Sequence, residues 1–172
     1  MDFFDISYLQ NGNIKQRKVY ILLSELKLFE NLQSFSPVLA GTIPINIDIE
    51  NSDLDIICYS KDLDKFKSEV IYYYGAIKGF EIWEKMIRNN LTVISRFKFQ
   101  DFFIEIFAQD RPVKDQEAYR HMIIENRILQ EKGEVFRKQI IQLKRQGYKT
   151  EPAFAELLNI EGDPYIELLN YY

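Results

Sequence analysis

Residues 38–59 constrain the fold of this 172-residue chain more than any other stretch. A short apolar run ends at a glycine, a polar connection follows, and Asp53 and Asp55 open a second apolar run. Alternate side chains of a strand share a face, so these two carboxylates point the same way and the apolar residues between them point the other way. Carboxylates in a core-like strand are costly to desolvate unless something compensates their charge. The segment therefore predicts a strand that directs two acids to one side of a sheet.

A divalent cation would compensate the two charges. Asp53 and Asp55 lie about 7 Å apart along one strand face, and carboxylate oxygens are ligands that hard ions such as Mg²⁺ or Mn²⁺ prefer. Such an ion keeps coordination positions for water and phosphate. The alternative is that Asp53 caps a turn and Asp55 lies solvated on an edge strand.

A third acid favours the metal interpretation. Residues 102–107 form a strongly β-prone run with a single charge, Glu105, in its middle. Alternation places Glu105 on one face with Phe103 and Phe107. If this strand is a neighbour of the strand that begins at residue 53, three carboxylates converge.

These segments resemble the nucleotidyltransferase superfamily typified by DNA polymerase beta. Its pattern is a glycine turn, an acid-apolar-acid-apolar motif about ten residues later, and an apolar-acid-apolar motif on a later strand. More closely, the chain resembles the DUF4269 family of small bacterial proteins placed in that superfamily. The segments that carry the resemblance are Gly41–Pro44 with Ile47-Asp48, Ser52–Cys58, Glu105–Phe107, Ala118–Met122, Lys149–Phe154 and Gly162–Tyr165.

The resemblance implies a fold and a catalytic type rather than a substrate. The fold would be α+β, with a nucleotidyltransferase-like mixed sheet flanked by helices and a helical C-terminal region. Asp53, Asp55 and Glu105 would be the catalytic, metal-binding acids, and Glu105 would also be a candidate base. Nucleotide-binding candidates are Gly41, Thr42, Ser52, Arg120 and His121.

The glycine turn departs from the superfamily pattern at one position. Serine or glycine usually follows the first glycine, and here the residue is Thr42. Threonine keeps the hydroxyl group but adds a methyl group beside the phosphate path. We expect the backbone at Gly41-Thr42 and the Thr42 hydroxyl to contact the outer phosphates, because a glycine turn allows a close approach.

Composition and charge limit the partners. The chain is 47% hydrophobic and 15% aromatic, which is typical of a globular protein. Its net charge of −4 argues against extended nucleic-acid binding, which requires clustered Lys and Arg. No signal peptide and no run of about 18 apolar residues is recognisable, so we expect no membrane insertion and a cytoplasmic location.

The first part of the chain alternates between helix and strand patterns. We expect strands at 91–99 and 102–107 to form a hairpin whose first arm carries Arg96 and Lys98 on one face. If Glu105 shares that face, these cations would meet a triphosphate, and otherwise they form an ion pair or an exposed edge. The pattern further predicts helices at 14–31 and 61–74, strands at 38–42 and 53–59, an extended loop at 43–51, and a strand or short helix at 80–88.

From residue 113 onward the pattern is helical. Asp115 is the candidate N-cap of a helix that ends at Gly133, and a second helix follows to about residue 146. Two short helices are expected near Thr150 and Asp163, where a capping residue precedes a proline. We therefore divide the chain into a nucleotidyltransferase-like domain, 1–112, and a helical region packed on it, 113–172.

Three polar residues outside the acidic strands have alternative interpretations. Asp48 either lines the pocket as a further acid or is a solvated loop residue. His121 is either a phosphate contact or a structural histidine, and a lone histidine is more often structural. Arg120 is the better phosphate ligand, because a guanidinium binds phosphate oxygens in pairs.

The sequence thus predicts a metal-dependent nucleotidyltransferase that transfers a nucleoside monophosphate from an NTP to a hydroxyl of a small-molecule or protein acceptor. The alternative is a catalytically silent module for nucleotide sensing or protein interaction that keeps the fold. No Walker loop, dinucleotide-binding glycine motif, zinc spacing or serine elbow is present.

Overall fold

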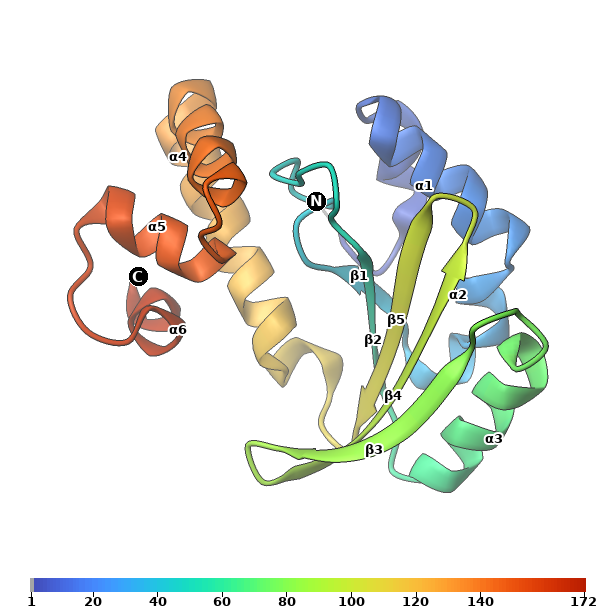
Figure 1. Cartoon of the computed structure of the whole chain (residues 1–172). Coiled ribbons are helices and arrows are strands. Elements are labelled where there is room, and N and C mark those ends of the chain that lie inside the picture. The colour runs from blue at the N-terminus through green and yellow to red at the C-terminus, as the bar shows by residue number, and fades with distance from the viewer. Residues whose placement is uncertain (1) are drawn as a thin grey trace. The chain divides into compact units, whose positions relative to one another are not determined.

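A five-stranded mixed sheet is the centre of the first part of the chain, in the computed structural model, which describes residues 2–172 (Figure 1). The strand order is β1-β2-β5-β4-β3. The pair β2–β5 is parallel, and the other three pairs are antiparallel. The strands are β1 Val38–Ala40, β2 Leu54–Tyr59, β3 Glu81–Ile87, β4 Asn90–Phe99 and β5 Phe102–Gln109. The predicted α+β class with a mixed sheet is confirmed.

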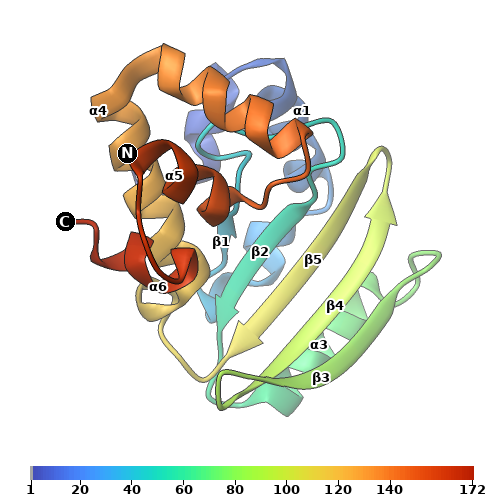
Figure 2. The same cartoon turned by 60° about the vertical axis from the view of Figure 1, so that its left-hand side comes forward.

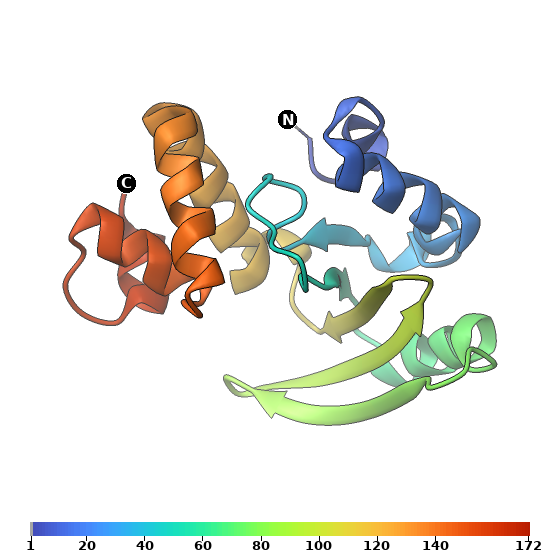
Figure 3. The ribbon, with the colours of Figure 1, turned by 45° about the horizontal axis from the view of Figure 1, so that its top comes forward.

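The burial of each strand follows its position in the sheet. Most apolar residues of β2 and four residues of β5 are buried because these strands lie inside the sheet, and both strands have the β-branched and aromatic composition that suits this place. β3 is an edge strand, largely exposed, and it pairs only with β4 (Figure 3). The segment 80–88, for which strand and helix were both open, is therefore a strand, and its charged residues suit an unpaired edge.

Helices cover one face of this sheet (Figures 1 and 2). The predicted helix 14–31 is divided, because Lys27 adopts left-handed backbone angles with φ 50°. Its first piece begins with a capping box between Asn13 and Gln16. The side chain of Asp62 caps the helix that was expected at 61–74. The helical elements are η1 Ile6–Asn11, α1 Ile14–Glu25, α2 Leu28–Asn31, η2 Gln33–Phe35 and α3 Leu63–Tyr74.

Aromatic contacts join α3 to the covered face of the sheet. The ring of Tyr74 stacks on Phe97 of β4 with centroids 5.5 Å apart, and Phe66 meets Phe35 edge to face. Such pairs add stabilisation to the free energy of apolar burial. Alternation places Leu54, Ile56, Ile104, Ile106 and Phe97 on this covered face, and all five are buried.

The C-terminal part of the chain is helical, as predicted. Gly133 has φ 77° and interrupts α4 at the predicted stop, which makes two helical segments that meet at an angle (Figure 2). The start was predicted wrongly, because Asp115 ends a 3-10 turn and α4 begins only at Glu117. Asp163 caps α6 as expected, with Pro164 in its first turn. The elements are η3 Val113–Asp115, α4 Glu117–Arg145, α5 Thr150–Leu158, α6 Pro164–Glu167 and η4 Leu168–Asn170.

The chain divides into two compact units by its internal contacts. The sheet unit contains the residues up to Ala40 together with Asp53–Gln116, and the helical unit contains Gly41–Ser52 together with Glu117–Tyr172. The loop that joins β1 to β2 is thus grouped with α4 rather than with the strands that it connects. Across residues 2–172, no helix has the length and apolar character that crossing a bilayer requires.

Loss of a phenylalanine ring should lower the free energy of unfolding much more on the covered face of the sheet than on the opposite face. Phe97 is 1% exposed on the covered face, so Phe97→Ala should lower the free energy of unfolding by about 3–5 kcal/mol. Phe103 is 48% exposed on the other face, so Phe103→Ala should cost about 1 kcal/mol or less. Urea unfolding of both variants measures the difference, and equal losses would contradict this assignment of faces.

Candidate functional site

The acids of β2 and β5 lie side by side. Asp55 and Glu105 are directly paired residues of these parallel strands, so their side chains leave the sheet on the same face. Asp53 lies two residues before Asp55 and immediately before β2. Asp55 and Glu105 are partly buried and Asp53 is exposed. The expected adjacency of the two acidic strands is thus present in the structure.

The electrostatics of Glu105 reflect this proximity. Burial raises the pKa of Glu105, the negative charge of Asp53 raises it further, and the positive charge of Arg96 lowers it. Like charges held close on one sheet face favour the binding of a cation. The donor atoms, three carboxylates, are of the kind that Mg²⁺ prefers. Within residues 2–172, however, no three His, Cys, Asp or Glu side chains are gathered closely enough to hold a metal ion without rearrangement.

Two cations and an aromatic ring lie beside the acids. Arg96 is the antiparallel partner of Glu105, and Lys98 is the partner of Phe103, so all four side chains share the acidic face. The Arg96 guanidinium lies 4.8 Å from the centre of the Phe103 ring, and the Lys98 ammonium lies 5.8 Å from it. Arg96 and Lys98 are both exposed. The condition set by the sequence, that the cations share the face of Glu105, is therefore met.

The Gly41–Ser52 segment, called here the β1–β2 loop, leaves the sheet next to Ala40, which pairs with Asp55. Gly41 has φ 76°, a left-handed conformation that glycine adopts without strain. The Ile47 N–H donates to the Thr42 carbonyl at 3.1 Å, and this bond closes the first half of the loop.

The side chain of Ser52 organises the second half of the loop. Its hydroxyl oxygen accepts a hydrogen bond from the Ile49 N–H at 2.9 Å. The Thr42 hydroxyl is oriented toward the same oxygen at 3.4 Å, which is long for a hydrogen bond between hydroxyl groups. Thr42 and Ser52, both predicted as nucleotide contacts, are therefore brought together across the loop.

Two basic residues of α4 hold the loop and were missed by the sequence interpretation. Arg137 donates to the Ile45 carbonyl and, at 3.3 Å, to the Asn46 carbonyl. Lys144 donates to the Ile47 carbonyl at 2.9 Å. The partners lie more than 90 residues apart, so no local pattern could have indicated these contacts.

His121 and Arg120 differ completely in their surroundings. His121 is buried, with Nε2 3.0 Å from the Tyr165 carbonyl and Nδ1 3.4 Å from the Glu151 carboxylate. The side chain thus connects α4 to α5 and α6. Arg120 is exposed, and no hydrogen bond or ion pair is found for it within residues 2–172.

A buried acid lies one turn after His121. Glu125 is 4% exposed. Burial raises its pKa to about 8, the charge of Glu151 adds to this effect, and the charge of Lys144 opposes it. Lys144 is itself only 7% exposed. The helical unit therefore contains a group of interacting charges in its interior.

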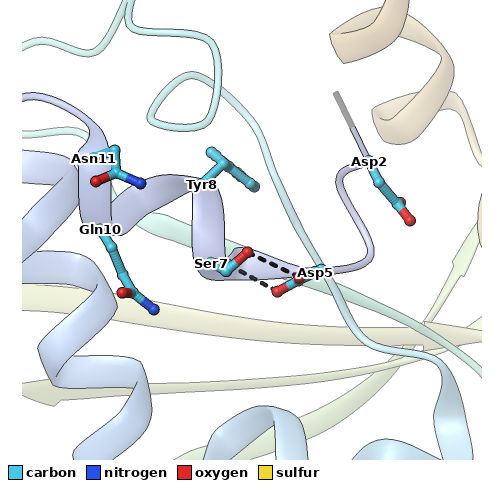
Figure 4. A pocket seen from close by; sticks show the side chains of 6 residues that line it. All are labelled: Asp2, Asp5, Ser7, Tyr8, Gln10 and Asn11. Carbon is cyan, nitrogen blue, oxygen red and sulfur yellow. Dashed lines mark hydrogen bonds between the residues drawn. The ribbon is translucent and has the colours of Figure 1, made fainter.

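A hollow of about 400 Å³ lies at the N-terminal end of the sheet unit (Figure 4). Its lining includes Asp5, whose carboxylate accepts hydrogen bonds from the backbone and hydroxyl of Ser7. No predicted site residue contributes to it. The lining residues are Asp2, Asp5, Ser7, Tyr8, Gln10 and Asn11.

The mixed sheet with flanking helices is the fold of known nucleotidyltransferase structures. A Cid1 structure described for its RNA terminal uridylyl transferase activity matches with a TM-score of 0.56 and 14% identity, over 77% of this chain and 41% of that one. A Cid1 poly(U) polymerase structure matches with a TM-score of 0.55 and 13% identity, over 85% and 48%. A Cid1 structure with Mg 3′-dATP bound matches with a TM-score of 0.54 and 15% identity, over 91% and 48%.

The family is defined by a separate match. Residues 21–171 match the model of the family described as "Domain of unknown function (DUF4269)", so the chain belongs to this family. No curated protein matches it. The chain spans less than half the length of each Cid1 structure named above. At this identity the similarity establishes the fold alone.

Glu125 predicts a pH dependence of stability. Its pKa in the folded protein, about 8, lies above its ordinary value of 4.5, so the folded state binds more protons between these values. The free energy of unfolding should therefore fall as pH rises from about 4.5 to about 8 and then level off. Glu125→Gln should remove this slope, and the melting temperature of the variant should gain on the wild type as pH rises, by about 2–4 °C for each kcal/mol.

Thermal unfolding between about pH 5 and pH 9 measures this difference. Glu156→Gln, an exposed change on α5, is the matched control and should follow the wild type. A constant difference between Glu125→Gln and the wild type over this range would show that Glu125 does not titrate as described.

Proposed function

We propose that this protein is a metal-dependent nucleotidyltransferase that transfers a nucleoside monophosphate from an NTP to a hydroxyl group of an acceptor. The observation that carries the proposal is the direct pairing of Asp55 with Glu105, with Asp53 immediately before β2. The acid-apolar-acid motif and the later acidic strand also follow the pattern of the superfamily typified by DNA polymerase beta.

Asp53, Asp55 and Glu105 would hold Mg²⁺ or Mn²⁺ through carboxylate oxygens. A bound divalent ion supplies charge neutralisation at the triphosphate and favours deprotonation of the acceptor hydroxyl. The pairing of Asp55 with Glu105 and the position of Asp53 immediately before β2 support this assignment. The raised pKa of Glu105 makes it the candidate for accepting the proton of the acceptor hydroxyl.

The remaining contacts would come from cations and from the β1–β2 loop. Arg96 and Lys98, on the face of Glu105, are placed to neutralise phosphate oxygens. The backbone at Gly41, with the hydroxyls of Thr42 and Ser52, would contact the outer phosphates. Of the two candidates Arg120 and His121, Arg120 is the better phosphate ligand, because both ring nitrogens of His121 already face protein acceptors.

The comparisons support nucleotide chemistry in general terms. The matched folds include Cid1 structures described with Mg 3′-dATP and with a UTP analogue. For this chain, the NTP and the small-molecule or protein acceptor are part of the proposal. The rival function is a nucleotide-sensing or interaction module without turnover, and the absence of a gathered metal cluster within residues 2–172 is the observation that favours it.

Substitution of the acids tests the proposal. Asp53→Asn, Asp55→Asn and Glu105→Gln each remove one negative charge with little change in size. Each should abolish the Mg²⁺-dependent rise in melting temperature on addition of NTP. Each should also lower pyrophosphate release in an acceptor screen by at least about 100-fold, a typical loss when one transition-state charge contact is removed.

Asp101→Asn, in the exposed turn between β4 and β5, is the control and should behave as the wild type. Stabilisation by NTP and Mg²⁺ that all three acid variants retain would exclude the acids as metal ligands. Stabilisation that is lost in the variants, without pyrophosphate release by the wild type under any acceptor, would favour the sensing module.

A further inference from the structure

The β1–β2 loop has no regular secondary structure, yet four of its residues, Ile43, Pro44, Ile45 and Ile47, are buried. Ile43, Ile45 and Ile47 are each at most 3% exposed. Buried backbone carbonyls need hydrogen-bond donors, and a loop cannot supply them through a ladder or a helix. Side chains of α4 donate hydrogen bonds to three successive carbonyls of the loop, those of residues 45 to 47.

Lys144 is the most buried of these donors. Its ammonium group donates to the Ile47 carbonyl at 2.9 Å, and Lys144 is 7% exposed. On the other side of the same residue, the Ile47 N–H donates to the Thr42 carbonyl at 3.1 Å. Two hydrogen bonds therefore connect Lys144 to Thr42, the residue of the loop that we assign to the outer phosphates.

Arg137 holds the turn that precedes Ile47. It donates to the carbonyls of Ile45 and Asn46, and Asn46 has φ 59°, a left-handed conformation that is unfavourable for most residues but tolerated by asparagine. The guanidinium is 14% exposed and also pairs with Glu134 at 3.0 Å. Hydrogen bonds to two successive carbonyls fix the backbone of this turn.

A neighbouring contact of the same loop differs in exposure. Arg145 pairs with Glu50 at 2.7 Å, but the two side chains are 58% and 68% exposed. Exposed ion pairs of this kind contribute about 0–1 kcal/mol, because water and salt screen them. A buried charged donor, in contrast, costs much more to remove when its acceptor stays buried. Two adjacent residues of α4 thus contact the same loop with very different expected effects.

We propose that Lys144 is a positioning residue for nucleotide binding, which acts by fixing the β1–β2 loop through the Ile47 carbonyl. This inference rests on the proposed function of the loop as the phosphate-contacting segment. It extends that function by one residue of α4, which contacts the loop backbone through the Ile47 carbonyl. Loss of Lys144 should therefore weaken NTP binding while the acids stay unchanged.

The test has to take account of Glu125, the buried acid whose charge interacts with that of Lys144. Lys144→Met keeps the aliphatic stem but leaves the buried Glu125 without its cation. The double variant Glu125→Gln/Lys144→Met removes both charges and so avoids an unpaired buried charge. Arg145→Met is the matched control, because it removes the exposed contact to the same loop one residue further along the helix.

Two measurements on the full chain separate positioning from general stability. NTP affinity in Mg²⁺ should fall about tenfold in the double variant and stay within about twofold of the wild type in Arg145→Met, where tenfold corresponds to about 1.4 kcal/mol. Hydrogen exchange of the amides at 43–49 should become at least about tenfold faster in the double variant, while exchange in β2 and β5 stays unchanged.

The outcomes distinguish a failure of the positioning role of Lys144 from a failure of the proposed nucleotidyltransferase function. Wild-type affinity and wild-type exchange of the loop in a folded double variant would overturn the role of Lys144. Faster loop exchange with unchanged affinity would overturn it as well, because the loop would then be held without consequence for the nucleotide. If the wild type itself binds no NTP, the proposed function fails, and the exchange data alone still show whether Lys144 fixes the loop.

Discussion

The parallel pairing of β2 with β5 is the constraint on which the candidate site depends. It places Asp55 directly beside Glu105 although 50 positions of sequence numbering separate them. Two carboxylates at this spacing repel each other, and partial burial increases the cost of their charge. The sheet tolerates the arrangement because its other face is apolar and packs against helices, with Tyr74 stacked on Phe97.

Arg96 and Lys98 lie on the same face of the sheet as the acids. Arg96 lies beside Glu105 in the register and over the Phe103 ring, but the structure gives it no direct hydrogen bond within residues 2–172. A structural ion pair would use its guanidinium donors, whereas a guanidinium held over an aromatic ring keeps them directed away from the ring. Arg96 is therefore held over an aromatic ring on the acidic face, where its charge lowers the pKa of Glu105.

The sequence could predict that Asp55 and Glu105 lie on strands because strand alternation is a local rule. The pairing of the two strands, which brings these acids side by side, had to come from the structure. The break of the first helix at Lys27 and the late start of α4 depend on individual backbone angles, which composition does not specify. Contacts such as Lys144 to Ile47 join segments 97 residues apart and have no local signal.

The grouping of the β1–β2 loop with the helical unit gives α4 a role that its own sequence does not suggest. The loop is covalently tied to the sheet at both ends, since Ala40 pairs with Asp55 and Leu54 begins β2. Its interior carbonyls are bound by Arg137 and Lys144 instead. The conformation of the loop therefore depends on two basic side chains of the helical unit rather than on pairing with the strands that it connects.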